Sequence, residues 1–278
     1  MKTIEDLVKQ ALAEDLGDGD HSGLSCISSD AVGKAKLLVK DDGIIAGLEV
    51  AKIVFNQVDP ELRLYFYKKD GDEVKKGEIA FEVEGKSLSI LRAERLALNF
   101  MQRMSGIATH TYRLKQLLKG LPTQILDTRK TTPNFRIFEK MAVKIGGGNN
   151  HRFGLYDMIM IKDNHIDYAG GIGKAIDKVY EYLKDKKLNI PIEVEARNLE
   201  EVKEILSAQK VDRIMLDNFT YEDLQTAVEL IGDYAETEAS GGITEETIRN
   251  YAECGVNYIS VGALTHQIKS LDLSLKAI

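Results

Sequence analysis

The stretch IEVEARNLEEVKEILSAQKVDRIMLD, residues 192–217, contains one complete strand–helix–strand unit. Ile192–Val194 and Ile214–Leu216 are short apolar runs of the kind that form buried strands. Leu199–Leu206 lies between them, with its apolar residues on one helical face. Two strands joined in this way favour a parallel pair with the helix packed outside the sheet.

The same alternation continues on both sides of this unit. The other predicted strands are Gln124–Leu126, Met158–Ile161, Ala235–Glu238 and Tyr258–Val261. The later helices are predicted over Tyr221–Ile231 and Thr244–Cys254. Strand-end positions recur every 22 residues, which is the length of one compact βα unit, at Glu195, Asp217, Ala239 and Val261. This regular spacing favours a β/α barrel over an open, doubly wound sheet.

The first hundred residues predict mixed α/β structure of a different kind. Ile4 to Leu12 follow one helical face, and Thr3 can cap the start of that helix. The next predicted elements are strands at Ala35–Val39, Arg63–Tyr67 and Glu78–Val83 and a helix at Glu49–Val58. A long helix is predicted from Ser87 to about Met104, and a second from Ile107 to Leu118. The change from this mixed pattern to the regular alternation of strands and helices predicts a domain boundary near Ser105.

Composition excludes several classes of protein. The 278 residues are 44% hydrophobic and 29% charged, which is ordinary for a globular protein and excludes a disordered chain or a collagen-like fibre. The formal charge of -7 excludes a globally basic surface for nucleic acid or anionic lipid. Cys26 and Cys254 match no metal-ligand spacing, and we expect free thiols. No apolar run approaches the ~20 residues that span a bilayer, and the acidic amino terminus lacks the pattern of a signal peptide. We therefore expect a cytoplasmic location and no membrane or nucleic-acid partner.

Charged and glycine-bearing turns follow the predicted strands, and in a barrel the carboxyl ends of the strands form the reactive face. Arg129 and Lys130 follow the first of these strands, and Lys162 follows the second. Glu195 and Asp217 end the next two strands, although a carboxylate in such a place often only caps a helix. Ser240-Gly241-Gly242 and Gly262-Ala263 follow the last two. With a helix beginning near Thr244, the first glycine turn would form a phosphate site.

Positive charge is concentrated in one segment. Residues 125–165 carry seven basic and four acidic residues, net +3, whereas the rest of the chain is net -10. Lys140 and Lys144 fit a solvated helix face, but Arg129, Lys130 and Arg152 flank turns and short strands. His151 and Arg152 end a glycine-rich loop, which suits ligand binding. This pattern predicts a small ligand with several negative charges.

Seven segments occur in the order seen in quinolinate phosphoribosyltransferases, and the chain resembles that family over nearly its whole length. They are AERLALNF (93–100), TRKTTP (128–133), GGGNNHR (146–152), IKDNH (161–165), LDNF (216–219), ASGGI (239–243) and VGALTH (261–266). The chain departs from the family pattern at Asn134, where glycine is commoner, and at Asn149, a variable place.

The resemblance implies a fold and an assembly. It implies an amino-terminal α/β sandwich domain over residues 1–104, joined by residues 267–278. It implies a carboxy-terminal, partly open α/β barrel over residues 105–266 that carries the active site. It also implies a homodimer whose active sites are shared between subunits.

The implied reaction joins quinolinate to phosphoribosyl pyrophosphate with Mg²⁺, giving nicotinate mononucleotide, pyrophosphate and carbon dioxide in NAD biosynthesis. The resemblance implies catalytic roles for Lys130, Lys162, Glu195 and Asp217. Glu195 and Asp217 would hold Mg²⁺ through water. The implied substrate-binding residues are Arg95, Thr128, Arg129, Lys130, His151, Arg152, Lys162, Ser240, Gly241, Gly242, Val261, Gly262 and Ala263. Arg95 would reach in from the neighbouring subunit.

Two alternatives stay open at this point. A related phosphoribosyltransferase acting on nicotinate or another aromatic acid would share most of these motifs, and release of carbon dioxide from quinolinate separates the two. The second alternative is a carrier module, because DGDEVKKGE (70–78) is similar to a biotinyl or lipoyl hairpin. Gly85-Lys86-Ser87 is a poor match to the tip that a carrier needs, so we interpret this hairpin as structural.

Overall fold

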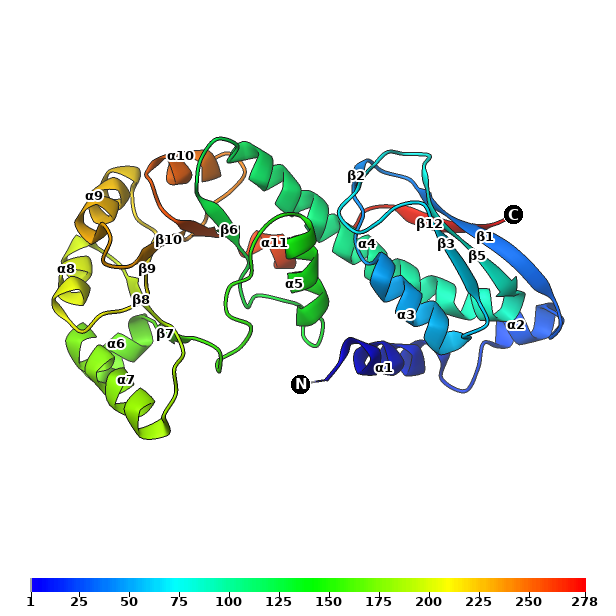
Figure 1. Cartoon of the computed structure of the whole chain (residues 1–278), viewed down its shortest axis with the longest axis horizontal. Coiled ribbons are helices and arrows are strands. Elements are labelled where there is room, and N and C mark those ends of the chain that lie inside the picture. Colours follow the sequence, from blue (N-terminus) through cyan, green and yellow to red (C-terminus); the bar gives the residue numbers. More distant parts are fainter. Residues whose placement is uncertain (1) are drawn as a thin grey trace. The chain divides into compact units, whose positions relative to one another are not determined.

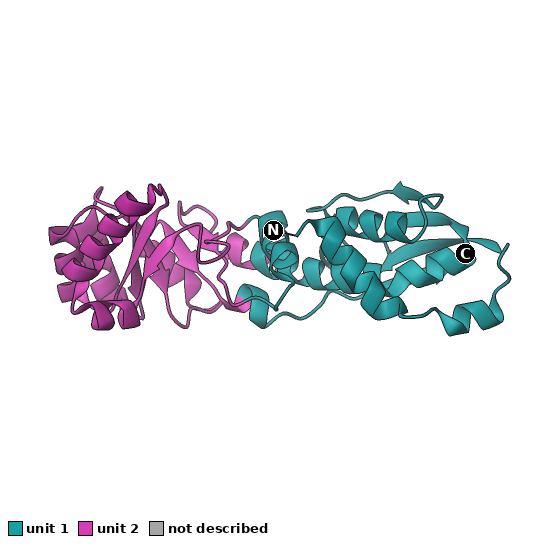
Figure 2. Ribbon diagram, turned by 90° about the horizontal axis from the view of Figure 1, so that it is seen from below, with its two compact units in different colours: residues 1–112, 131–147, 264–278 teal, residues 113–130, 148–263 magenta. Residues whose placement is uncertain are grey.

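The computed structural model describes residues 2–278, and the chain divides into two compact units. Unit 1 comprises residues 1–112, 131–147 and 264–278, and unit 2 comprises residues 113–130 and 148–263 (Figure 2). No helix within residues 2–278 has the length and apolar character needed to cross a membrane.

Unit 1 is built on a four-stranded antiparallel sheet in the order β12-β1-β5-β3. The strands are β1 (Val32–Val39), β3 (Arg63–Phe66), β5 (Ile79–Lys86) and β12 (Leu273–Ala277). A second, two-stranded sheet pairs β2 (Gly43–Ile44) with β4 (Glu73–Val74). β12 comes from the end of the chain and pairs along β1, from Ala35 opposite Ala277 to Val39 opposite Leu273.

The helices of unit 1 follow the apolar pattern of the sequence. They are α1 (Ile4–Leu16), α2 (His21–Cys26), α3 (Leu48–Val58), α4 (Ser87–Leu117) and α5 (Arg136–Ile145). Thr3 and Asp6 form the capping box that begins α1. Phe55 of α3 packs against Phe81 of β5 with ring centroids 5.8 Å apart, and both side chains are fully buried. Their contact places the core of unit 1 between α3 and the sheet.

α4 corrects one prediction. The sequence predicted two helices separated near Ser105, whereas α4 runs unbroken from Ser87 to Leu117. Gly106 does not break the helix. Instead it lets the helix approach the backbone of Lys269, because a Cβ on Gly106 would lie 2.4 Å from the Lys269 carbonyl oxygen. The glycine therefore serves close packing in the middle of a helix.

Unit 2 is an α/β barrel with one open side (Figure 1). Its six parallel strands follow the order β6-β11-β10-β9-β8-β7, and the two end strands do not pair with each other. They are β6 (Gln124–Leu126), β7 (Ile159–Ile161), β8 (Ile192–Ala196), β9 (Arg213–Asp217), β10 (Glu236–Ser240) and β11 (Tyr258–Ser260). All six lie within two residues of their predicted positions, since short apolar runs bounded by turns mark buried parallel strands clearly.

Helices cover the outer face of this sheet (Figure 1). They are α6 (Asp163–Ala169), α7 (Ile172–Lys186), α8 (Leu199–Ser207), α9 (Tyr221–Ile231) and α10 (Ile248–Glu253), and α11 (Ala263–His266) crosses the junction of the two units. The predicted α/β class, with a small antiparallel-sheet domain and a parallel-strand barrel, is confirmed.

Candidate active site

The carboxyl ends of the strands in unit 2 bring together most of the predicted site residues. Lys162 directly follows β7, Glu195 lies one residue before the end of β8, and Asp217 is the last residue of β9. Ser240 is the last residue of β10 and lies opposite Asp217 in the strand register. Because the strands are parallel, these side chains meet at one rim of the barrel.

Lys162 and Glu195 form an ion pair across neighbouring strands, between the Lys162 Nζ and the Glu195 Oε2. The Glu195 side chain is 9% exposed and that of Lys162 is 41% exposed, so the lysine forms the solvent side of the pair. An ammonium in this position can leave the carboxylate for a negatively charged ligand, since it already faces solvent.

Both carboxylate oxygens of Asp217 are engaged by neighbouring side chains. The Ser240 hydroxyl donates to Oδ1, and the Asn218 amide nitrogen donates to Oδ2 at 2.6 Å. The backbone N–H of Asn218 also donates to the Ser240 carbonyl at 2.9 Å. The carboxylate of Asp217 is therefore held in one orientation at the rim.

Neither strand-end carboxylate caps a helix. The Asn198 side chain accepts from the Glu201 N–H at 2.9 Å and begins α8. The Thr220 hydroxyl accepts from the Asp223 N–H at 3.2 Å and begins α9. Because the caps are supplied by other residues, Glu195 and Asp217 are available for another role.

The glycine turn after β10 has a backbone that requires glycine. Gly241 and Gly242 have φ of 98° and 58°, in the left-handed region. A Cβ on Gly241 would also lie 2.2 Å from the Asn218 Oδ1. The predicted helix start near Thr244 is wrong: α10 begins at Ile248, because a turn closed by the Thr247 hydroxyl on the Thr244 N–H precedes it. Any phosphate site here consists of the glycine turn without a helix start.

Val261, Gly262 and Ala263 lie where β11 passes into α11. The Val261 N–H donates to the Leu126 carbonyl of β6 at 3.0 Å, which holds this turn to the neighbouring strand. On the same strand end, the Thr128 hydroxyl accepts from the Lys130 N–H at 3.1 Å. The loop that carries Arg129 and Lys130 is thus ordered by its own threonine.

Two arginines from separate loops are near enough for the charge of one to affect the other. Burial lowers the pKa of Arg152, and the charge of the nearby Arg129 lowers it further. The Arg152 guanidinium also donates from Nη1 to the Met158 carbonyl at 3.3 Å. Two like charges held near each other in a partly buried place cost free energy, and an anion between them relieves that cost.

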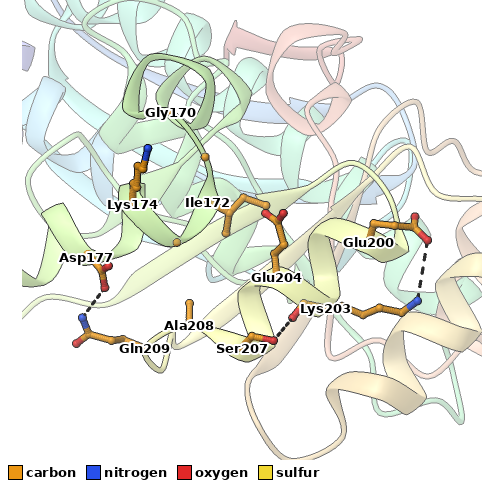
Figure 3. A pocket seen from close by; sticks show the side chains of 12 residues that line it. Gly170, Ile172, Lys174, Asp177, Glu200, Lys203, Glu204, Ser207, Ala208 and Gln209 are labelled. Carbon is orange, nitrogen blue, oxygen red and sulfur yellow. Dashed lines mark hydrogen bonds and ion pairs between the residues drawn. The ribbon is translucent and has the colours of Figure 1, made fainter.

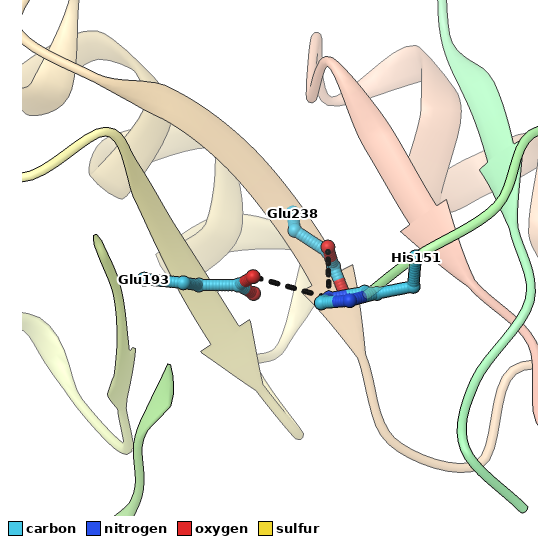
Figure 4. Close-up of side chains that lie close together, drawn as sticks. All are labelled: His151, Glu193 and Glu238. Carbon is cyan, nitrogen blue, oxygen red and sulfur yellow. Dashed lines mark ion pairs between the residues drawn. The ribbon is translucent and has the colours of Figure 1, made fainter. Parts of the chain in front are cut away.

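His151, next to Arg152 in the chain, has a buried side chain that faces two strands of the sheet. Its Nε2 lies 3.1 Å from the Glu193 Oε2 of β8 and 3.4 Å from the Glu238 Oε2 of β10. Figure 4 shows the three side chains converging from three separate segments. The Arg213 Nη1 of β9 contacts the same Glu238 oxygen at 3.0 Å. Both carboxylates have side chains with no exposed surface.

The charged groups in this cluster shift one another's pKa values. Burial, together with Glu238, raises the pKa of Glu193. Burial acts to raise the pKa of Glu238 as well, but contacts with His151 and Arg213 lower it overall. Burial acts to lower the pKa of His151, whereas the two carboxylates raise it to about 9. The His151 Nδ1 accepts from the Arg152 N–H at 2.6 Å, so the ring carries its proton on Nε2, the nitrogen that faces the two carboxylates.

One group among residues 2–278 has three side chains placed to share a metal ion, and it is His151, Glu193 and Glu238. Arg213 already supplies a counter-charge to Glu238, which lowers the need for a metal ion there. Glu195 and Asp217 fit Mg²⁺ better, because they are carboxylates at a solvent-facing rim. Mg²⁺ keeps several waters and needs only one or two such ligands in addition to substrate phosphates.

Two of the basic residues considered in the sequence belong to unit 1. Arg95 is exposed on α4 of unit 1. Lys140 was expected on a solvated helix face, but it is only 2% exposed and that expectation is wrong. α5 buries its Glu139 and Lys140 together, whereas Lys144 is exposed as expected. Helical spacing alone does not distinguish these two lysines, because each lies on the edge of the apolar stripe.

A hollow of about 960 Å³ lies between α7 and α8 on the outside of the barrel (Figure 3). Its lining includes Gly171, Lys174, Glu200 and Lys203. None of the predicted site residues lines it. It is therefore separate from the rim that carries the candidate active site.

Four polar residues of the site were not predicted as functional. They are Asp127, Glu193, Asn218 and Glu238. Glu193 and Glu238 stand two residues before Glu195 and Ser240, so they share a strand face with a predicted residue. Acidic residues at alternate positions of a buried parallel strand are a usable signal, because such strands are normally apolar.

Comparison with known proteins gives one consistent result. The family model "Quinolinate phosphoribosyl transferase, N-terminal domain" matches residues 19–105, and its "C-terminal domain" matches residues 107–276. The chain is 48% identical to the decarboxylating quinolinate phosphoribosyltransferase 2b of Nicotiana tabacum, over 98% of this chain and 82% of that protein. It is 49% identical to a nicotinate-nucleotide pyrophosphorylase (carboxylating) of Arabidopsis thaliana, with the same coverage.

A solved structure agrees over the whole chain. The crystal structure of NadC from Streptococcus pyogenes matches with a TM-score of 0.93 and 40% sequence identity, covering 99% of this chain and 97% of that one. The fold of both units is therefore shared with that protein.

Proposed function

The chain belongs to the quinolinate phosphoribosyltransferase family, and from this premise we propose how its own residues carry the reaction. The resemblance inferred from seven motifs is confirmed. The reaction transfers a phosphoribosyl group to quinolinate with loss of carbon dioxide, in NAD biosynthesis. The alternatives of a carrier module and of a different aromatic acid are not favoured by any comparison.

The arginine pair is the observation that supports our assignment of the quinolinate site. Quinolinate carries two carboxylates, and an arginine fork binds a carboxylate through two parallel hydrogen bonds. Arg129 and Arg152 lie within reach of each other's charge. We assign them to the substrate carboxylates, with His151 beside them, and assign Arg95 to the same substrate from the partner subunit of a homodimer.

The remaining residues of the rim suit phosphoribosyl pyrophosphate. Lys130 and Lys162 would contact its pyrophosphate, and Thr128 would order the loop that carries Lys130. The turns Ser240–Gly242 and Val261–Ala263 would hold the 5′-phosphate through backbone N–H groups. Glu195 and Asp217 would orient the ribose hydroxyls.

Glu195 and Asp217 are also the residues that we propose to hold Mg²⁺ through water, since they are a carboxylate pair at the ends of neighbouring strands. When bound, Mg²⁺ would neutralise negative charge on the leaving pyrophosphate. The Lys162 ammonium would move from Glu195 to that pyrophosphate as it arrives.

Positioning and electrostatics account for the chemistry. The ring nitrogen of quinolinate attacks the ribose C1 as the bond from C1 to the pyrophosphate oxygen breaks, and positive charge develops on the sugar. The Glu195 and Asp217 carboxylates stabilise that charge. The positive ring nitrogen then stabilises the electron pair left on C2 when carbon dioxide departs, and C2 takes a proton from water. We also propose a cytoplasmic location, whereas the Nicotiana tabacum and Arabidopsis thaliana relatives are named mitochondrial and chloroplastic.

Arg129→Ala tests the quinolinate assignment. Losing a charge-assisted contact is expected to raise the KM for quinolinate by about 10- to 100-fold, with the KM for phosphoribosyl pyrophosphate little changed. Release of labelled carbon dioxide from quinolinate, with nicotinate as the competing acid, measures turnover and separates the two substrates.

Arg197→Ala is the matched control, because Arg197 also follows a strand end but is bonded to Glu201 at 2.6 Å. Its kinetics should equal those of the unmodified protein. Unchanged quinolinate kinetics in the Arg129 variant would contradict the assignment of Arg129.

A further inference from the structure

The segment that carries His151 lies beside β6, one of the two end strands of the sheet. Asn149 pairs with Leu126 of β6 in the parallel sense, and its N–H donates to the Ile125 carbonyl at 2.8 Å. The His151 N–H then donates to the buried Asp127 Oδ1 at 2.9 Å. The segment therefore extends the sheet beyond β6, and its direction sends the His151 side chain into the interior.

The imidazole of His151 connects two strands to one peptide of the candidate active site. On one side, Nε2 faces the carboxylates of Glu193 and Glu238 at 3.1 and 3.4 Å. On the other side, Nδ1 accepts from the Arg152 N–H at 2.6 Å. The ring is 4% exposed, so its position is set by these contacts rather than by solvent.

Of the two carboxylates, Glu238 is also held by a residue of the strand between them. Arg213 of β9 binds Glu238 at 3.0 Å and packs its guanidinium over the Tyr258 ring at 4.0 Å. Glu193 and Glu238 come from β8 and β10, which both pair with β9 (Figure 4). Burying two carboxylates in a barrel costs free energy that apolar residues of the same size would avoid. Their presence therefore calls for a role beyond filling the barrel.

We propose that Glu193 and Glu238 are positioning residues for quinolinate binding: they fix the imidazole of His151, and the imidazole fixes the main chain from which the Arg152 guanidinium extends. The inference rests on the proposed function, in which Arg152 binds a substrate carboxylate. In this proposal, buried residues inside the barrel orient Arg152. The proposal concerns quinolinate, to which Arg152 is assigned, whereas Glu195 and Ser240, further along the same two strands, are held by contacts of their own to Lys162 and Asp217.

Substitutions at Glu193 separate positioning from simple packing. Glu193→Leu removes the acceptor that faces the His151 Nε2 and keeps the volume, so the Kd for quinolinate, measured by calorimetry, is expected to rise about tenfold. Glu193→Gln keeps an oxygen acceptor and should restore binding to within about threefold of the unmodified protein. The KM for quinolinate should follow the Kd, while the KM for phosphoribosyl pyrophosphate stays constant.

Glu236→Gln is the control, because Glu236 lies on the same strand as Glu238 but pairs with Arg213 and Tyr258. It should leave quinolinate binding unchanged. If Glu193→Leu does not fold, Glu193→Asp keeps the charge and shortens the reach, and it should weaken quinolinate binding in the same direction by a smaller factor.

Arg152→Ala distinguishes failure of this inference from failure of the proposed function. If Arg152→Ala weakens quinolinate binding but the Glu193 variants do not, the positioning role is overturned and the substrate assignment stands. If Arg152→Ala has no effect either, both are overturned. A parallel loss of affinity for both substrates in Glu193→Leu would show general disturbance of the barrel and would also overturn the positioning role.

Discussion

Asn134 occupies a backbone position that most residues avoid. Its φ is 61°, and it follows Pro133 in a turn closed by a hydrogen bond of 3.1 Å from the Phe135 N–H to the Thr132 carbonyl. Proline followed by a residue with positive φ is the pattern of a type II turn, which favours glycine or asparagine at this place. The departure from the family pattern at Asn134 thus keeps the conformation that glycine would supply.

Replacing Asn134 tests this explanation. Asn134→Ala should lower the free energy of unfolding by about 1 kcal/mol, because a Cβ without a polar side chain is strained in the left-handed region. Asn134→Gly should lie within about 0.5 kcal/mol of the unmodified protein. Denaturant unfolding measures both, and equal stability of the two variants would show that the turn imposes no strain.

Helix α4 shows how packing decides the extent of an element. Gly106 interrupts a helical pattern in the sequence, and glycine is a poor helix former. The helix nevertheless continues, because the main chain at Lys269 and Ser270 packs directly on this glycine. Ser105 and Thr109, on either side of it, bind the backbone of Ala46 and Ile44. These tertiary contacts compensate for the low helix propensity of the glycine.

Gly106→Ala should destabilise the protein despite a better helix propensity. The added Cβ would overlap the Lys269 carbonyl, and relieving such overpacking costs about 1–3 kcal/mol. Gly173→Ala is the control, since Gly173 lies in helix α7 with nothing within 4 Å of the added atom. That variant should be stabilised by up to about 1 kcal/mol. Thermal unfolding compares them, and a stabilised Gly106 variant would contradict the packing argument.

At the level of the assembly, charge is distributed unevenly. The chain is net -7, and its positive segment supplies the arginine pair at the barrel rim. Arg95 lies on α4 in unit 1, whereas Arg129 and Arg152 lie in unit 2. If Arg95 completes the active site of the partner subunit, as we propose, an isolated subunit lacks a complete site.

A subunit with Arg95→Ala and a subunit with Arg129→Ala should complement each other's activity in a mixed dimer. In a mixed dimer one site would lack both arginines and the other would have both, so random mixing should restore about a quarter of the unmodified activity. Co-expression with two affinity tags, activity assays and light scattering measure this result. If the mixture is no more active than either variant alone, Arg95 does not act across subunits.

The order of strands and helices and the seven motifs were readable from the amino-acid sequence. Short apolar runs predict the buried parallel strands, and several charged motifs in a fixed order along the sequence predict the site. The rim residues Lys162, Glu195, Asp217 and Ser240 could be placed together in advance, because strand ends of a barrel share one face.

The tertiary structure alone decided the rest. Lys140 became buried and α4 ran through Gly106, since both depend on contacts with distant segments. The barrel interior is the clearest case: Glu193 and Glu238 are 45 positions apart in the sequence and meet at His151 only when the strands close around it. The local sequence pattern predicts which face of a strand a side chain lies on. The partners that lower the free-energy cost of burying its charge come from distant segments, which only the tertiary structure brings together.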